Sequence, residues 1–178
     1  MVQKRGHDKY MRSFKGIIAI LSITFAAAFA ASAQTNLTGL DGSRVDIEGQ
    51  TGKVVILAIG ASWLPLSSKQ AEFTTVLAKK YSGKNVVVYF VVTDSSNSKS
   101  KNHATDDQIR KFAADSKLSV TILRDSEGIA TVKKYRVEQM PSFVILNKTG
   151  SQAGEPFGGI DPKFDVTVPI SKVVDKLM

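Results

Sequence analysis

Two long apolar runs constrain the fold of this chain more than any other feature of its sequence. Residues 54–59 (Val-Val-Ile-Leu-Ala-Ile) and residues 86–92 (Val-Val-Val-Tyr-Phe-Val-Val) are uncharged and rich in β-branched side chains. Runs of this length and composition are typical of strands that are buried on both faces of a sheet. Because such a strand needs a layer of structure above it and another below it, the sequence predicts an α/β architecture.

The segments around these runs alternate between helix-like and strand-like patterns. Apolar residues at spacings of three and four indicate amphipathic helices, whereas short β-branched runs bounded by turn residues indicate strands. In chain order, the predicted elements are a hairpin over residues 35–52, the first apolar strand, a helix over 67–81, the second apolar strand, a mobile polar loop over 94–104, a helix beginning at Thr105 or Asp106, a strand over 119–123, a short helix over 128–135, a strand over 143–146 with a partner around 152–157, and a final helix with Pro169 in its first turn. This alternation predicts one α/β domain over residues 34–178, with a mixed central β-sheet, helices on both faces and an N-terminal β-hairpin.

The first 33 residues have the composition of a signal peptide. A basic start is followed by an apolar run of about 15 residues, which is shorter than the roughly 20 that a membrane-spanning helix needs. Ala31-Ser32-Ala33 places small residues where a signal peptidase cleaves. We predict cleavage after Ala33 and a periplasmic or secreted protein. An uncleaved signal anchor is the alternative, and Met11 is an alternative start to Met1.

Net charge limits the classes of partner. The whole chain carries a net charge of +8, but residues 1–33 contain five basic residues and one acidic residue. Residues 34–178 therefore carry 19 basic and 15 acidic side chains, and their lysines are scattered along the sequence rather than clustered with aromatic residues. We expect no nucleic-acid partner, and contact with a membrane only through an uncleaved signal segment.

Three segments resemble the TlpA/ResA-type periplasmic thioredoxins. Residues 52–73 (GKVVILAIGASWLPLSSKQAEF) are similar to the strand and helix start where that family carries Ala-Ser-Trp-Cys-Pro-Pro-Cys. Residues 135–150 resemble the family's tyrosine-to-proline segment, and the Leu-Asp-Gly turn at 40–42 also matches. The resemblance covers roughly residues 37–160 and implies a thioredoxin-like fold. It also implies a cis peptide bond at Met140-Pro141, the alternative being an ordinary trans proline.

The residues that perform the chemistry of that family are replaced here, since the chain contains no cysteine. The resemblance places Leu64 and Ser67 at the two cysteine positions, whereas the reaction needs two thiols, one with a lowered pKa at a helix N-terminus. The family's proton-handling positions correspond to Ala58 and Gln70, and glutamine is no general base at ordinary pH. We therefore predict no catalytic residues and no redox activity, although family similarity alone would suggest a redoxin-type oxidoreductase.

Other kinds of chemistry find little support in the sequence. Ser67 and Ser68 would need a nearby base to act as nucleophiles, and Ser67 is most simply a helix cap. His103, the one histidine of residues 34–178, falls in the polar loop, where a solvated side chain is the simpler interpretation. No spacing of histidines or carboxylates suits a metal, and no glycine-rich phosphate loop occurs. We expect neither a metal nor a cofactor; an enzyme of unknown class is the alternative.

The resemblance implies a binding surface in place of a reactive one. Proteins of this fold hold extended peptide beside the cis-proline loop through backbone hydrogen bonds, in the manner of an added strand. The residues that would line this surface here are Trp63, Leu64, Pro65, Leu66, Met140 and Pro141. Either this apolar edge binds a protein or extended peptide, as in a chaperone or accessory subunit, or Leu64 and Leu66 pack inward. The sequence leaves the oligomeric state open.

Overall fold

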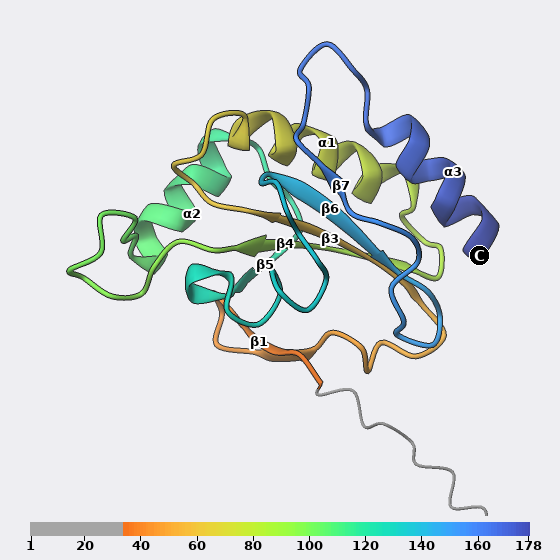
Figure 1. The fold of residues 1–178 in the computed structure, drawn as a ribbon, viewed down its shortest axis with the longest axis horizontal. Coiled ribbons are helices and arrows are strands. Elements are labelled where there is room, and N and C mark those ends of the chain that lie inside the picture. Colours follow the sequence, from red (N-terminus) through yellow and green to blue (C-terminus); the bar gives the residue numbers. More distant parts are fainter. Residues whose placement is uncertain (1–33) are drawn as a thin grey trace, which may run out of the picture. The chain divides into compact units, whose positions relative to one another are not determined.

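A seven-stranded mixed sheet organises the part of the chain that the computed structural model describes, residues 34–178 (Figure 1). The predicted signal peptide, residues 1–33, lies outside the described residues. The elements in chain order are β1 (Asn36–Gly39), β2 (Arg44–Asp46), β3 (Val54–Gly60), α1 (Ser67–Lys80), β4 (Val86–Val92), α2 (Asp106–Asp115), β5 (Thr121–Arg124), the 3₁₀ helix η1 (Ser126–Gly128), β6 (Ser142–Leu146), β7 (Phe157–Gly158) and α3 (Thr167–Leu177). The strands lie in the order β2-β1-β5-β4-β3-β6-β7.

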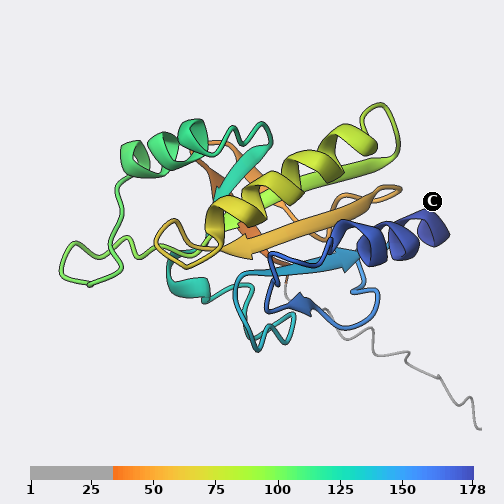
Figure 2. The ribbon, with the colours of Figure 1, turned by 90° about the horizontal axis from the view of Figure 1, so that it is seen from above.

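The two apolar runs form neighbouring strands of this sheet (Figure 2). β3 pairs in parallel with β4 and antiparallel with β6, while β4 pairs in parallel with β5. Every residue of β3 is buried, as its uninterrupted apolar sequence predicts. The N-terminal hairpin also forms as predicted, because β1 pairs antiparallel with β2, and β1 then joins the sheet beside β5.

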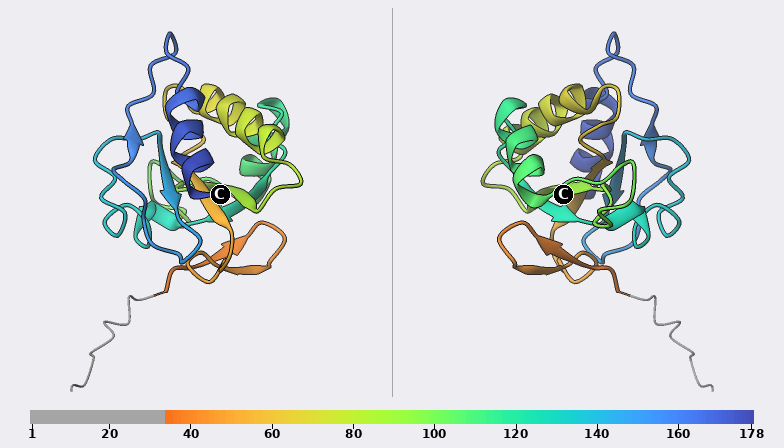
Figure 3. Two further views of the ribbon diagram at one scale, coloured as in Figure 1. Left: turned by 90° about the vertical axis from the view of Figure 1, so that its right-hand side faces the viewer. Right: turned by 90° about the vertical axis from the view of Figure 1, so that its left-hand side faces the viewer.

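The two faces of the sheet are covered by different kinds of structure (Figure 3). All three α-helices pack on one face, where Phe73 of α1, Ile109 of α2 and Ile170 of α3 belong to the same apolar cluster as Ile56. The other face of the sheet packs against the β1–β2 hairpin and against the segment before β6. Tyr135, from that segment, belongs to the apolar cluster on this face. Helical cover on this second face is thus limited to the short 3₁₀ helix η1.

The short helix expected over residues 128–135 is wrong beyond Gly128, where the 3₁₀ helix η1 ends. Turns follow η1 there, and Glu127 and Gly128 have φ angles of 61° and 68°, which lie outside the α-helical region. The carboxylate of Asp125 accepts hydrogen bonds from the backbone N–H groups of Ala130 and Thr131, at 3.0 and 2.9 Å. The i→i−4 bonds that follow, from the Val132 N–H to the Gly128 carbonyl and from the Tyr135 N–H to the Thr131 carbonyl, do not form a continuous ladder, so the segment is a series of turns rather than a helix.

The polar loop over 94–104 is more ordered in its contacts than its composition suggested. Ser95 at its start pairs with His103 near its end, and the Ala104 N–H donates to the Ser95 carbonyl at 3.2 Å. The following helix α2 begins at a capping box formed by Thr105 and Gln108, which confirms the predicted helix start. Within residues 34–178, no helix is both long enough and apolar enough to cross a membrane.

Candidate functional site

The turn between β3 and α1 has a conformation that the family's sequence would not allow. Leu66 precedes α1 with φ 69° and ψ 7°, a left-handed conformation that is uncommon for a residue other than glycine. The family pattern has proline at this position, and the proline ring fixes φ near −65°. The turn that enters α1 therefore differs in backbone geometry from a Cys-Pro-Pro-Cys turn.

Ser67, at the second cysteine position, is buried and used by the backbone. Its hydroxyl contacts the carbonyl oxygen of Ala61 and lies 2.9 Å from that of Leu64. The interpretation of Ser67 as a helix cap is wrong, because the capping position is occupied by Leu66 and no side chain caps the helix. The hydrogen bonds found for the Ser67 hydroxyl go to carbonyl oxygens, which cannot act as a base toward it.

The predicted binding residues divide between exposed and inward-facing positions. Trp63 is 51% exposed, Leu66 38% and Met140 37%, and Pro65 is also exposed. Leu64 is half-buried and Pro141 is buried. The alternative in which both leucines pack inward does not hold for Leu66, which is exposed, and Leu64 is only half-buried.

Strand pairing brings the loop over 61–66 and the loop over 136–141 to the same end of the sheet. Ile59 near the end of β3 pairs with Ser142 at the start of β6, so the loop over 61–66 begins where the loop over 136–141 ends. The peptide bond between Met140 and Pro141 is cis. The Thr93 hydroxyl, at the end of β4, donates to the Gly60 carbonyl at 2.9 Å and lies 4.0 Å from the Met140 sulfur.

Gln70 ties these two segments together. The side chain is fully buried, and its Nε2 donates hydrogen bonds to the carbonyl oxygens of Ile59 at 3.1 Å and Ser142 at 2.9 Å. A Cβ atom at residue 60 would collide with Gln70 Oε1, so this close approach requires Gly60. The sequence indicated Gln70 only as the loss of a general base, whereas the structure gives it a positioning role.

Asp94 is a second positioning residue, and the sequence did not indicate it. Its fully buried carboxylate accepts hydrogen bonds from the Ser62 N–H at 2.8 Å and from the Ser62 hydroxyl at 2.5 Å. These bonds hold the backbone immediately before Trp63. Asp94 begins a polar loop and its partner lies 32 positions earlier in the chain, so no local pattern could have identified the contact.

A charged cluster holds the other end of the loop over 136–141. Glu48 lies 2.8 Å from Lys134 Nζ, accepts a hydrogen bond from the Tyr135 hydroxyl, and accepts another from the Thr35 N–H at 2.6 Å. Burial by itself would raise the pKa of Glu48, but these hydrogen bonds outweigh burial and lower the pKa below its ordinary 4.5. Burial first, and then the bond to Glu48, raise the pKa of Tyr135 above 10.

Within residues 34–178, no three histidine, cysteine, aspartate or glutamate side chains lie close enough together to hold a metal ion. The Nδ1 atom of His103 lies 3.0 Å from the Ser95 carbonyl oxygen within the closed polar loop. Among residues 34–178, the hydrogen bonds of Ser67 and Ser68 go to other partners than His103. The structure therefore does not place this histidine as a base beside either serine.

Comparison with solved structures identifies the fold as thioredoxin-like. The exposed lipoprotein thioredoxin Etrx1 of Streptococcus pneumoniae is 24% identical with a TM-score of 0.64, over 82% of this chain and 100% of that one. A secreted disulfide oxidoreductase of Mycobacterium tuberculosis is 21% identical with a TM-score of 0.58, over 81% of this chain and 96% of that one. A thioredoxin-like protein of Aeropyrum pernix is 20% identical with a TM-score of 0.62, over 80% of this chain and 89% of that one.

Sequence comparison assigns the family. No curated protein sequence matches this chain significantly. The family model described as Redoxin, however, matches residues 20–152, which is more than half of the chain. The absence of cysteine fits a member in which the Cys-x-x-Cys motif has been lost. The chain therefore belongs to the Redoxin family.

Proposed function

We propose that this protein is an exported, redox-inactive member of its family that binds an extended segment of a protein partner, as a chaperone or accessory module does. The observation that carries this proposal is the exposure of Trp63, Leu66 and Met140 at the end of the sheet where the reactive thiols of relatives would lie. Exposed apolar side chains on the two loops that meet at this end of the sheet favour protein binding over solvation.

Binding here would be wholly non-covalent. A thiol-disulfide exchange protein holds its substrate through a mixed disulfide, which requires an attacking thiolate. This chain has no cysteine, and its two thiol positions hold a half-buried leucine and a buried serine. An extended segment would instead be held by apolar contacts with Trp63, Leu66 and Met140 and by backbone hydrogen bonds along the loop over 136–141.

Direct binding tests this proposal. The ligand is a reduced and carboxymethylated polypeptide, which is extended and has no free thiol. We expect saturable binding by fluorescence anisotropy, and a loss of roughly tenfold or more in affinity for Leu66→Asp, because a charge replaces an apolar contact. Val76→Asp is the matched control, since Val76 is similarly exposed, at 45%, in the middle of α1. Equal binding by both variants, with folding verified by circular dichroism, would show that this face is not the binding surface.

Redox inactivity has its own test. Pure protein should give no turnover in an insulin-reduction assay, at any concentration at which a cysteine-containing relative is active. Reproducible turnover would refute the redox-inactive part of the proposal while leaving the binding part unaffected.

Export is supported by the composition of residues 1–33 and by the location of two similar proteins, of which one is secreted and one is an exposed lipoprotein. Expression in the native cell followed by fractionation and N-terminal sequencing tests it. We expect a mature chain that begins at Gln34 in the periplasmic or secreted fraction. An uncleaved chain in the membrane fraction would indicate a signal anchor, and an uncleaved chain in the cytoplasm would refute export.

A further inference from the structure

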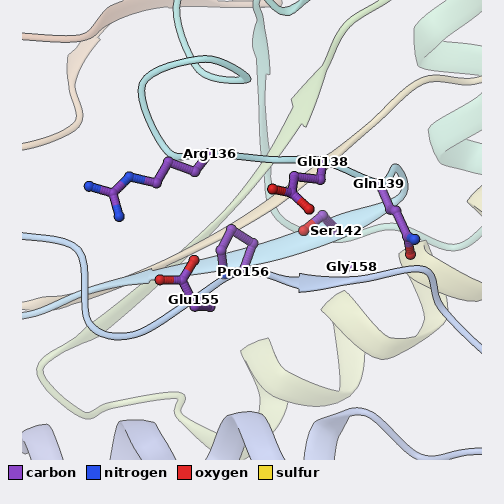
Figure 4. A pocket seen from close by; sticks show the side chains of 7 residues that line it. All are labelled: Arg136, Glu138, Gln139, Ser142, Glu155, Pro156 and Gly158. Carbon is purple, nitrogen blue, oxygen red and sulfur yellow. The ribbon is translucent and has the colours of Figure 1, made fainter.

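A pocket of about 340 Å³ lies beside the loop that carries the Met140–Pro141 bond (Figure 4). Its walls come from the loop before β6, from the first residue of β6, and from the segment that enters β7. The residues that matter for its chemistry are Arg136, Glu138, Gln139, Ser142, Glu155 and Gly158. Gln139 and Ser142 flank Met140 and Pro141 in sequence, so the pocket adjoins the proposed binding face.

The floor of this pocket contains a polar group without a partner. Ser142 is fully buried, and its Oγ has no hydrogen bond within the described part of the chain. Its carbonyl oxygen is already bonded to Gln70, so the hydroxyl is the free group. A buried hydroxyl without a partner loses its hydration without compensation and calls for an explanation, such as a water molecule or a ligand that completes the site.

Two carboxylates and one guanidinium, that of Arg136, line the pocket. Glu138 and Glu155 both line the pocket and are exposed, and neither is within 4.0 Å of a basic group in the ion pairs found among residues 34–178. Figure 4 shows the Glu138 carboxylate on the side of Ser142, whereas the Arg136 side chain extends away from Ser142. The end of the pocket nearest the binding face therefore offers two kinds of acceptor, a carboxylate and a hydroxyl.

We propose that this pocket selects a basic side chain, lysine or arginine, from the extended segment bound at the neighbouring face. The cationic nitrogen would donate hydrogen bonds to Ser142 Oγ and to the carboxylates of Glu138 and Glu155. Lysine and arginine are the side chains that can donate several such bonds and carry the complementary charge. This inference rests on the proposed function, because the basic side chain is delivered by a segment that binds beside Met140.

Substitution of Arg136 tests which charge the pocket selects. The Arg136 guanidinium lies at the same pocket and would repel a second cation, so its removal should strengthen binding of a basic segment. If the pocket instead selected an acidic side chain through Arg136, its removal would weaken binding. The two charge classes therefore predict opposite signs for the same substitution.

The test uses two families of thiol-free peptides that differ at one position. One family carries a single lysine that is moved through the sequence of an extended apolar peptide, and the other carries glutamine at the same places. We expect the best lysine peptide to bind roughly tenfold more tightly than its glutamine partner, the size typical of a charge-assisted hydrogen bond at a partly exposed site. The preference should decrease at high salt.

Variants separate this inference from the proposed function. Glu138→Gln/Glu155→Gln should abolish the lysine preference, while Arg136→Ala should increase the preference. Equal binding of the two peptides, or a preference that survives the double substitution, would overturn the pocket assignment and leave the proposed function standing, with water as the partner of Ser142. Failure of every peptide to bind would overturn the proposed function and this inference together.

Discussion

The loop over 136–141 is held at its two ends by different chemistry. At Ser142 the anchor is neutral, because the buried amide of Gln70 donates to the Ser142 and Ile59 carbonyl oxygens. At Tyr135 the anchor is charged, because Glu48 bonds the Tyr135 hydroxyl and Lys134. The amide does not titrate, whereas the carboxylate does. The Glu48 anchor at the Tyr135 end can therefore depend on pH, whereas the Gln70 anchor at the Ser142 end contains no titratable group.

Removal of the charged anchor should have the largest effect. Glu48→Ala leaves Lys134 Nζ, the Tyr135 hydroxyl and the Thr35 N–H without their shared acceptor. Because the Glu48 side chain is only 15% exposed, we expect a loss of about 3 kcal/mol in the free energy of unfolding, measured with denaturant. Glu155→Ala removes an exposed carboxylate and should change stability by less than about 0.5 kcal/mol. Similar values for the two variants would contradict the assignment of Glu48 as an anchor.

Removal of the neutral anchor should have a somewhat smaller effect. Gln70→Leu leaves two buried carbonyl oxygens without their donor but also removes the unbonded Gln70 Oε1. We therefore expect a loss of about 2 kcal/mol, equal at pH 5 and pH 8 because no titratable group is involved. A loss that changes between these pH values would show that the anchor is coupled to a charge that the structure does not place there.

Gln70→Glu should convert the neutral anchor into one that depends on pH. A carboxylate enclosed by two carbonyl oxygens is disfavoured, so the folded state would raise its pKa and bind the proton more tightly than the unfolded state does. For a group with a raised folded pKa, stability is lost as pH rises. The variant should therefore be less stable at pH 8 than at pH 5. Equal stability at both pH values would mean that solvent reaches position 70.

The unmodified protein should lose stability at both extremes of pH through the charged anchor. Glu48 has a lowered folded pKa, so its contribution is present above pH 4.5 and is lost as pH falls through the folded value. Tyr135 has a raised folded pKa, so its contribution is present below pH 10 and is lost as pH rises further. Thermal melts from pH 3 to pH 11 measure both limbs. If the Glu48→Ala variant loses as much stability at acid pH as the unmodified protein does, other carboxylates are responsible for that loss.

The smallest effect is expected at Leu66, where stability and binding should change in opposite directions. Leu66→Gly relieves the left-handed backbone conformation and should raise stability by up to about 1 kcal/mol, while it removes an apolar contact of the proposed binding face. Val76→Gly, in the helix interior, should instead lower stability by about 1 kcal/mol without affecting binding. Thermal melts and anisotropy measure the two quantities. A less stable Leu66→Gly variant would show that the leucine side chain, partly covered at this position, contributes more than the strain costs.

Local patterns predicted most of the fold. The continuous apolar run over 54–59, the hairpin turn at 40–42 and the Thr105 helix start each depend on neighbours in sequence, and each appears where expected. The helix expected over 128–135 was wrong, because Glu127 and Gly128 have positive φ angles where it would begin and the i→i−4 bonds that follow are not continuous. The spacing of apolar residues carries no information about such backbone angles.

The candidate site was less predictable, because its contacts join residues far apart in the chain. The bond from Gln70 to Ser142 spans 72 positions, and that between Tyr135 and Glu48 spans 87. The sequence identified the residue types that the redox reaction lacks, and hence the positions of Leu64, Ser67 and Gln70. It could not indicate that the last two form structural hydrogen bonds, nor that Ser142 faces a pocket.

Fluorescence of Trp63 tests the central claim most directly, that this face binds without reacting. Trp63 is the one tryptophan of the chain and is half exposed, so its emission reports on this face alone. On titration with a carboxymethylated, thiol-free polypeptide, we expect a saturable shift of the emission to shorter wavelength as the bound segment covers the indole, and no shift with Leu66→Asp. An unchanged spectrum at concentrations where anisotropy shows the polypeptide bound would place binding elsewhere and contradict the claim.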